Sequence, residues 1–265
     1  MKFIYFTKTL QKLDVPALVG FCKATGLDGA DMAVRPGFPV APDNSAKELP
    51  RAAAAFKDAG LSIGLVSAPT GLIDPESRPA RAIFDACGEA SIPAVKIGYF
   101  PFRAPFDACL KEARAKLAGF AKLAEKTKAK AVYHTHSGAM LGNNAAGARM
   151  LLDGLDPHHA GAFLDTGHTA INGGPPAMEF DLLKPWVSLV AIKDMAWTKA
   201  GKGWRVDVVP VGDGIVDWPG VGKALKALGF KGTISLHGEY EAKDLDERKE
   251  LAKKERAALK KHLGA

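Results

Sequence analysis

Histidine and carboxylate side chains follow short apolar runs in the second half of the chain. His134 and His136 lie two residues apart at the end of one run, and His237 and Glu239 repeat this spacing near the C-terminus. Residues two apart in an extended strand point to the same face. Neutral imidazole is a common metal ligand and also an acid or base near neutral pH. The spacing therefore predicts metal binding or proton transfer where these strands end.

Two further runs end in groups of the same kind. Asp165 follows an apolar run directly, His168 comes three residues later, and Lys193 ends another run. A carboxylate in such a place is costly unless it binds a metal, pairs with a cation or accepts several hydrogen bonds. His168 is either a functional group of the same cavity or a capping residue. Lys193 is either an acid or oxyanion-binding group or an ordinary ion-pair partner of Asp194 or another carboxylate.

Together, these strand ends offer a set of nitrogen and oxygen ligands. His134, Asp165, His237 and Glu239 are the predicted metal ligands, with His136, Lys193 and His168 as the predicted catalytic groups. Such ligands suit Mn, Fe, Co, Ni or Zn better than Ca. A divalent metal would polarise a carbonyl or vicinal diol, and a flanking acid or base would move a proton at the adjacent carbon.

Two long segments carry possible substrate contacts. Arg35 opens the segment 35–45, where it is predicted to bind substrate or to form an ion pair at the rim. Trp197 lies in the segment 195–216, where it is predicted to bind substrate, cap the site or join a dimer. Long ordered loops in compact domains are usually functional.

The elements that position these groups alternate along the chain. Short apolar runs give way to alanine- and lysine-rich amphipathic segments, which is typical of a parallel sheet built from strand–helix units. We expect strands at 3–6, 29–34, 62–68, 94–100, 130–136, 160–165, 187–194 and 232–239. We expect helices near 14–25, 45–59, 77–90, 106–127, 143–153, 176–183, 217–228 and 243–263. Eight such units predict an α/β fold, a (β/α)₈ TIM barrel, as a single domain over residues 1–265. An open doubly wound sheet is the alternative, but no early strand is followed by a glycine-rich phosphate turn.

Composition narrows the class of protein. The chain has 265 residues and a net charge of +7, but the excess lysines fall on helix-like segments, so we expect no nucleic-acid partner. No apolar run is long enough to span a membrane, and the N-terminus does not resemble a signal peptide. The three widely spaced cysteines suit a reducing compartment. We therefore expect a cytoplasmic protein that acts on a small molecule, either alone or as a homo-oligomer.

Several motifs give the chain a resemblance to a known family. They are VRPGFPVAP, YHTHSG, LDTGHTAINGG, VAIKDMAW, PVGDGIVDW and GFKGTISLHGEYE. On these motifs the whole chain resembles the xylose-isomerase-like TIM barrels, a group of sugar phosphate isomerases and epimerases, and YHTHSG is similar to the strand-five motif of inosose dehydratases.

The resemblance implies a metal site that this sequence alters. In the family, Glu, Asp, His and Glu from the last four strands usually hold a divalent metal. Asp165 matches directly, His134 replaces the first Glu, and Ala191 falls where the His is usual. The last Glu falls on His237, or on Glu239 if the strand end is shifted by two residues.

These features favour a metal-assisted isomerase or epimerase acting on a carbohydrate, a sugar or keto-sugar. A lyase or dehydratase of a keto-sugar or keto-cyclitol is the first alternative, because the two reactions share the abstraction of a proton beside a carbonyl. A metal-free sugar-binding barrel is the second. A DNA-repair endonuclease is disfavoured because the first four strands supply few of the ligands that its three zinc ions need.

Overall fold

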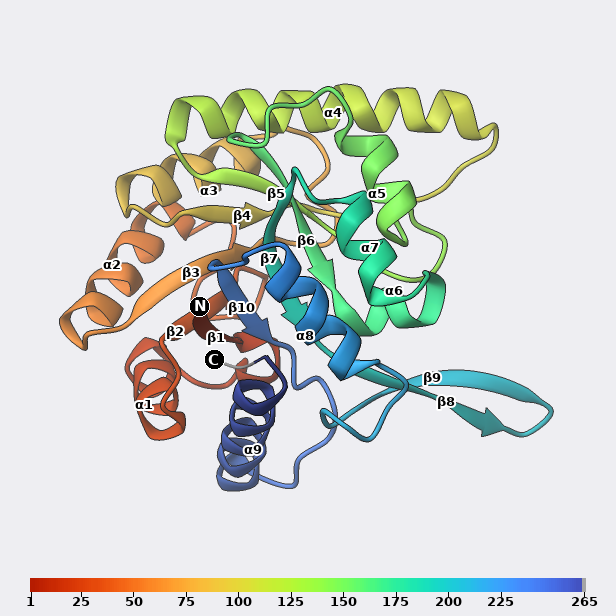
Figure 1. Cartoon of the computed structure of the whole chain (residues 1–265). Coiled ribbons are helices and arrows are strands. Elements are labelled where there is room, and N and C mark those ends of the chain that lie inside the picture. Colours follow the sequence, from red (N-terminus) through yellow and green to blue (C-terminus); the bar gives the residue numbers. More distant parts are fainter. Residues whose placement is uncertain (264–265) are drawn as a thin grey trace.

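A closed barrel of parallel strands forms the centre of the protein. The computed structural model describes residues 1–263, and within them eight strands close in the order β1-β10-β7-β6-β5-β4-β3-β2 (Figure 1). The barrel strands are β1 (Lys2–Phe6), β2 (Gly29–Ala33), β3 (Ser62–Ser67), β4 (Ala94–Lys96), β5 (Lys130–His134), β6 (Ala160–Asp165), β7 (Val187–Ile192) and β10 (Thr233–Leu236). This confirms the predicted TIM barrel.

Helices surround the barrel and follow the predicted positions closely. They are α1 (Val15–Thr25), α2 (Ser45–Asp58), α3 (Arg78–Glu89), α4 (Phe106–Thr127), α5 (Ala145–Leu152), α7 (Pro176–Leu182), α8 (Trp218–Ala227) and α9 (Leu245–Leu263). The sequence did not predict the short helix α6 (Thr166–Asn172) or the 3₁₀ turn η1 (Thr7–Leu10). Among residues 1–263, no helix is both long enough and apolar enough to cross a membrane.

The barrel interior explains how the strands aim their last side chains. One apolar cluster fills the interior and consists of Ile4, Leu65, Ala94, Val132, Phe163, Leu189 and Ala191. Because side chains alternate along a strand, the residue two positions beyond an interior one faces the same way. His134 follows Val132 in this manner, Asp165 follows Phe163 and Lys193 follows Ala191. The packed interior thus directs these polar groups to the carboxyl-terminal mouth, where TIM barrel enzymes carry their sites.

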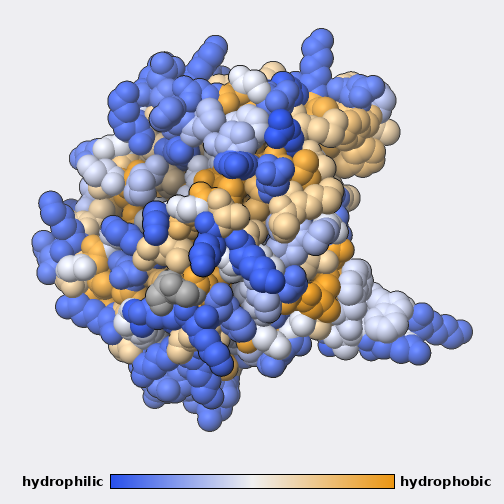
Figure 2. All heavy atoms as spheres, in the orientation of Figure 1, coloured by the Kyte–Doolittle hydropathy of each residue, from blue (hydrophilic) through white to orange (hydrophobic). Residues whose placement is uncertain are grey.

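The segment 195–216 was predicted to be a long loop, and this was wrong for most of its length. Antiparallel strands β8 (Asp194–Ala200) and β9 (Gly203–Val209) form a hairpin that projects from the barrel (Figure 1). Figure 2 shows the same segment as a narrow arm with a hydrophilic tip. Trp197 and Trp204 are 49% and 66% exposed on this arm.

Asp194 fixes the base of the hairpin. Its buried carboxylate accepts hydrogen bonds from the backbone N–H groups of Met195, Gly212, Gly214 and Val216 at 2.9–3.2 Å. It also accepts the indole N–H of Trp218 at 2.9 Å. Five donors satisfy the buried charge, which is why Asp194 needs no ion pair with Lys193.

We expect Asp194→Asn to destabilise the protein strongly. The amide has one acceptor oxygen instead of two, so several of these buried N–H groups lose their partner, at a cost of about 3 kcal/mol. Urea unfolding followed by circular dichroism measures the change in unfolding free energy. Asp213→Asn, an exposed change in the same segment, is the matched control and should leave the free energy unchanged within about 0.5 kcal/mol. Equal effects from the two substitutions would contradict this role for Asp194.

Candidate active site

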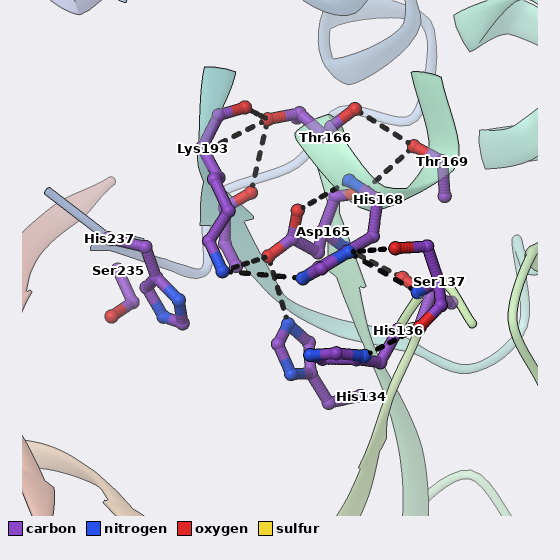
Figure 3. Close-up of polar contacts among 12 residues, drawn as sticks. His134, His136, Ser137, Asp165, Thr166, His168, Thr169, Lys193, Ser235 and His237 are labelled. Carbon is purple, nitrogen blue, oxygen red and sulfur yellow. Dashed lines mark hydrogen bonds and ion pairs between the residues drawn. The ribbon is translucent and has the colours of Figure 1, made fainter. Parts of the chain in front are cut away.

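A small polar cavity opens at the carboxyl-terminal mouth of the barrel. Side chains from nearly every strand end reach it. The lining residues are Phe6, Lys8, Arg35, Ser67, Thr70, Lys96, Tyr99, His134, His136, Lys193, His237 and Glu239. Asp165 lies beneath them, and Figure 3 shows Lys193, His134 and His168 pointing towards its carboxylate.

Three of the predicted metal ligands come together here. In the described part of the chain, His134, Asp165 and His237 are buried, and each offers one ligand atom within 4.8 Å of the others. Two imidazoles and one carboxylate match the three-protein-ligand sets that catalytic metal sites use. The donor set therefore fits a divalent transition metal.

Tyr99 and Asp165 orient the ring of His134. The Nε2 atom lies 3.1 Å from Asp165 Oδ2, and the Nδ1 atom lies 2.7 Å from Tyr99 Oη. Burial, the largest cause, together with the nearby His237 and lysine charges, holds the pKa of His134 well below its usual value. His134 is therefore neutral at pH 7, the state that binds metals.

His237 has no hydrogen-bond partner at either ring nitrogen among residues 1–263. Its ring stacks on Phe6 with centroids 4.5 Å apart. Asp31 and Glu239 lie 3.5 and 3.6 Å from its two nitrogens, too far for good hydrogen bonds but close enough to act as charges. Burial lowers the pKa of His237, but these carboxylates outweigh it and raise the pKa. A buried imidazole without a hydrogen-bond partner calls for an explanation, and a bound metal ion would supply the missing partner.

The fourth predicted ligand, Glu239, lies outside this group of ligand atoms. Its carboxylate contacts Lys8 and lies 2.7 Å from Lys193 Nζ. Burial alone would raise the pKa of Glu239, but His237 and the two ammonium groups hold it well below its usual range. In this structure Glu239 is thus an ion-pair partner.

Lys193 occupies the centre of the cluster and does not pair with Asp194. Its Nζ atom lies 3.3 Å from His168 Nε2 and 3.9 Å from Asp165 Oδ2. The side chain is 5% exposed, and that exposed part faces the cavity. An ammonium group held there can meet an oxygen on which negative charge develops.

His136 and His168 form a pair of imidazoles at the edge of the site. Strand β5 ends at His134, so His136 belongs to the following loop, and its ring lies over that of His168 with centroids 3.9 Å apart. The Ser137 backbone N–H and Oγ lie 3.2 and 2.8 Å from His168 Nδ1, and Lys193 Nζ lies 3.3 Å from Nε2, so both ring nitrogens have polar partners. Burial lowers the pKa of both histidines. Asp165 Oδ1 caps α6 by accepting the His168 backbone N–H, so the chain around His168 is fixed as well.

The two predicted substrate contacts have different outcomes. Arg35 lines the cavity, with its guanidinium 5.7 Å from the ring of Phe6. Among the described residues that line this cavity, Trp197 is absent, because it lies on the exposed arm. Sequence reasoning did not single out Tyr99 or Asp31 as site residues. Lys96, the last residue of β4, also faces the cavity.

A second buried cluster supports the loop that carries His237 and Glu239. Arg248 of α9 donates hydrogen bonds to the carbonyls of Gly238 and Tyr240 at 2.6 and 2.7 Å. Glu255 of the same helix is 6% exposed, and burial raises its pKa to about 7 although Arg248 opposes this. The helix thus fixes the backbone on both sides of Glu239.

The raised pKa of Glu255 predicts a pH-dependent stability. The folded pKa of about 7 lies above the ordinary value of 4.5, so the folded state binds the proton more tightly than the unfolded state. This contribution is fully present below pH 4.5 and is lost as pH rises through 7. Relative to Glu255→Gln, which cannot titrate, the native protein should lose on the order of 3 kcal/mol of unfolding free energy across this range. Parallel stability curves for the two proteins would contradict the prediction.

The chain belongs to the xylose isomerase-like TIM barrel family, whose sequence profile matches residues 19–262. No curated protein sequence matches the chain. The resemblance inferred from its motifs is therefore confirmed at the level of the family.

Solved structures share the fold at low sequence identity. The 3-keto-D-glucoside 4-epimerase YcjR from E. coli is 17% identical with a TM-score of 0.76, and 98% of this chain and 99% of that chain align. The probable 3-DHS dehydratase AsbF from Bacillus anthracis is 17% identical with a TM-score of 0.72, over 98% of both chains. The IOLI protein with a bound zinc atom is 18% identical with a TM-score of 0.79, over the whole of both chains. At these identities the likeness establishes the fold.

Proposed function

We propose that the protein is a metal-dependent isomerase or epimerase that transfers a proton at the carbon beside the carbonyl of a sugar or keto-sugar. The observation that carries this proposal is the group of ligand atoms from His134, Asp165 and His237 within 4.8 Å, with Lys193 adjacent at the mouth of the barrel. Metal-free sugar binding would not require this convergence of titratable side chains.

The position of each residue in the site suggests its role in the proposed reaction. A divalent ion held by His134, Asp165 and His237 would polarise the substrate carbonyl. Lys193, neighbouring Asp165 and facing the cavity, stabilises the negative charge that develops on the oxygen. His136, which lines the cavity and is neutral because burial lowers its pKa, accepts the proton from the adjacent carbon.

A dehydratase is the second candidate, favoured by the pair of imidazoles at the cavity edge. Loss of a β-hydroxyl needs a proton donor besides the base, and the Lys193 ammonium group contacts the His168 ring, which lies beside the ring of His136. Similar folds in an epimerase and a probable dehydratase support both candidates.

Proton exchange tests the proposal directly. Purified protein would be analysed for metal, loaded with Mn²⁺, Co²⁺ or Zn²⁺, and incubated in D₂O with ketoses, 3-keto-sugars and inosose. We expect metal-dependent deuterium incorporation beside the carbonyl, followed by NMR and abolished by EDTA. Enone absorbance with a keto-substrate would favour the dehydratase. A protein that retains no metal and exchanges no proton from any of these compounds would overturn the proposal.

A further inference from the structure

Two basic side chains of the cavity have buried nitrogen atoms without a hydrogen-bond partner among residues 1–263. Lys96 is 2% exposed, and its Nζ atom has no hydrogen-bond partner among residues 1–263. The Nε atom of Arg35 is also buried without a partner in this part of the chain. Arg35 is, after burial, the second cause that lowers the pKa of Lys96 to about 7, so the two groups act on one another across the cavity.

The hydrogen bonds and ion pairs of the nearby carboxylates go to groups other than Lys96 and Arg35. Glu239 pairs with Lys8 and Lys193. Asp165 contacts His134 and caps α6. Asp31 accepts a hydrogen bond from Ser235 through Oδ2 at 2.9 Å, and its Oδ1 is buried without a partner among residues 1–263. The ring of Tyr99, 3.7 Å from Lys96 Nζ, is the nearest compensation for that group. An aromatic face offsets only part of the cost of burying an ammonium group.

We infer that Arg35 and Lys96 form a subsite for an oxyanion of the substrate, a carboxylate or a phosphate. This inference rests on the proposed function, because it places the reacting carbonyl at the cluster of His134, Asp165 and His237. In the barrel order, β2, which precedes Arg35, lies opposite β6, which ends at Asp165. Likewise β4, which ends at Lys96, lies opposite β10, which precedes His237, while His134 ends the neighbouring strand β5. A substrate that spans the mouth would bring its carbonyl to one side and its oxyanion to the other.

The charged residues that line the cavity also favour an anionic substrate. Lys8, Arg35, Lys96 and Lys193 line the cavity, and among the described lining residues Glu239 is the only carboxylate. A divalent cation at the predicted ligands would add further positive charge. A guanidinium and an ammonium in a buried site recognise an oxyanion through charge-assisted hydrogen bonds. A neutral sugar would leave both cations unpaired.

Calorimetric titration tests this subsite without turnover. D-Fructose, D-gluconate and D-fructose 6-phosphate would serve as neutral, carboxylate and phosphate probes. We expect at least one anionic probe to bind about tenfold more tightly than fructose. The probe with the higher affinity then shows whether the oxyanion is a carboxylate or a phosphate. Lys96→Met and Arg35→Met should each remove this preference. Lys111→Met, which deletes an exposed lysine of α4, should preserve it.

The variants distinguish failure of the subsite from failure of the proposed function. If Lys96→Met does not fold, Arg35→Met decides, because Arg35 is only partly buried. Equal binding of all three probes, or an anion preference that survives in both variants, overturns the inference. Metal-dependent exchange on neutral sugars together with equal binding of the three probes would overturn the subsite while leaving the proposed function intact. Anion binding without metal or exchange would uphold the subsite and contradict the proposed reaction.

Discussion

Asp165→Asn is expected to remove metal binding while leaving the fold intact. The two oxygens of Asp165 have different tasks: Oδ1 caps α6 through the His168 N–H at 2.9 Å, and Oδ2 lies 3.1 Å from His134 Nε2. Asparagine can keep the capping oxygen but loses the charge. Because a metal site needs a deprotonated ligand, the affinity should fall at least about 100-fold, with loss of metal-dependent exchange.

Metal analysis after gel filtration, with thermal unfolding of the same samples, measures both effects. Asp181→Asn, an exposed change on α7, is the matched control and should retain native metal content. Full metal content in Asp165→Asn would show that the ligands lie elsewhere. Loss of metal together with a collapsed unfolding temperature would point to the cap instead, and His237→Gln, which involves no cap, would then decide.

Local alternation was enough to locate much of the site. His134, Asp165 and Lys193 each follow an interior apolar residue by two positions, and a barrel turns this local rule into convergence at one mouth. The rule needs no knowledge of long-range contacts. The prediction for Trp197 rested instead on an expected long loop. That segment pairs as a hairpin that turns around residues 201–202, which places Trp197 outside the described lining of the cavity.

Other parts of the site depend on geometry that the sequence does not display. The pairing register of β2 and β3 shifts between Ala30 and Asp31, so simple alternation could not place the Asp31 carboxylate beside Ser235. Tyr99 lies three residues beyond the end of β4 and reaches His134 of the next strand. The pairing of Lys193 with Glu239 joins two strand ends that are far apart in the chain. These contacts form only in the closed barrel, so the local sequence does not reveal them.

The helix α6 shows how one residue can serve two purposes. The sequence left His168 either as a functional group of the cavity or as a capping residue. The structure contains a cap, made by Asp165, and also brings the His168 ring to Lys193. A short helix that starts directly after a strand was not predicted, because the signal for a cap and the signal for a ligand are here the same carboxylate.

Lys193→Met should reduce turnover far more than substrate binding. The ammonium group lies 2.7 Å from Glu239 and 3.3 Å from His168, inside a site where few water molecules can replace it. If it stabilises charge that develops only in the transition state, kcat should fall about 10²–10³-fold with little change in KM. The measurement is the rate of metal-dependent exchange at varied substrate concentration.

Lys8→Met is the matched control for the role of Lys193. Lys8 also contacts Glu239, but its side chain is 46% exposed, so water can take its place. If Lys193 merely neutralised Glu239, the two substitutions would act alike and chiefly alter stability. We expect instead a kcat effect for Lys8→Met below about tenfold, because an exposed ion pair contributes little. Equal kcat values for Lys193→Met and the native protein would exclude Lys193 from the reaction. A fall in metal content in Lys193→Met would instead assign it to the support of Asp165, from which its Nζ lies 3.9 Å away.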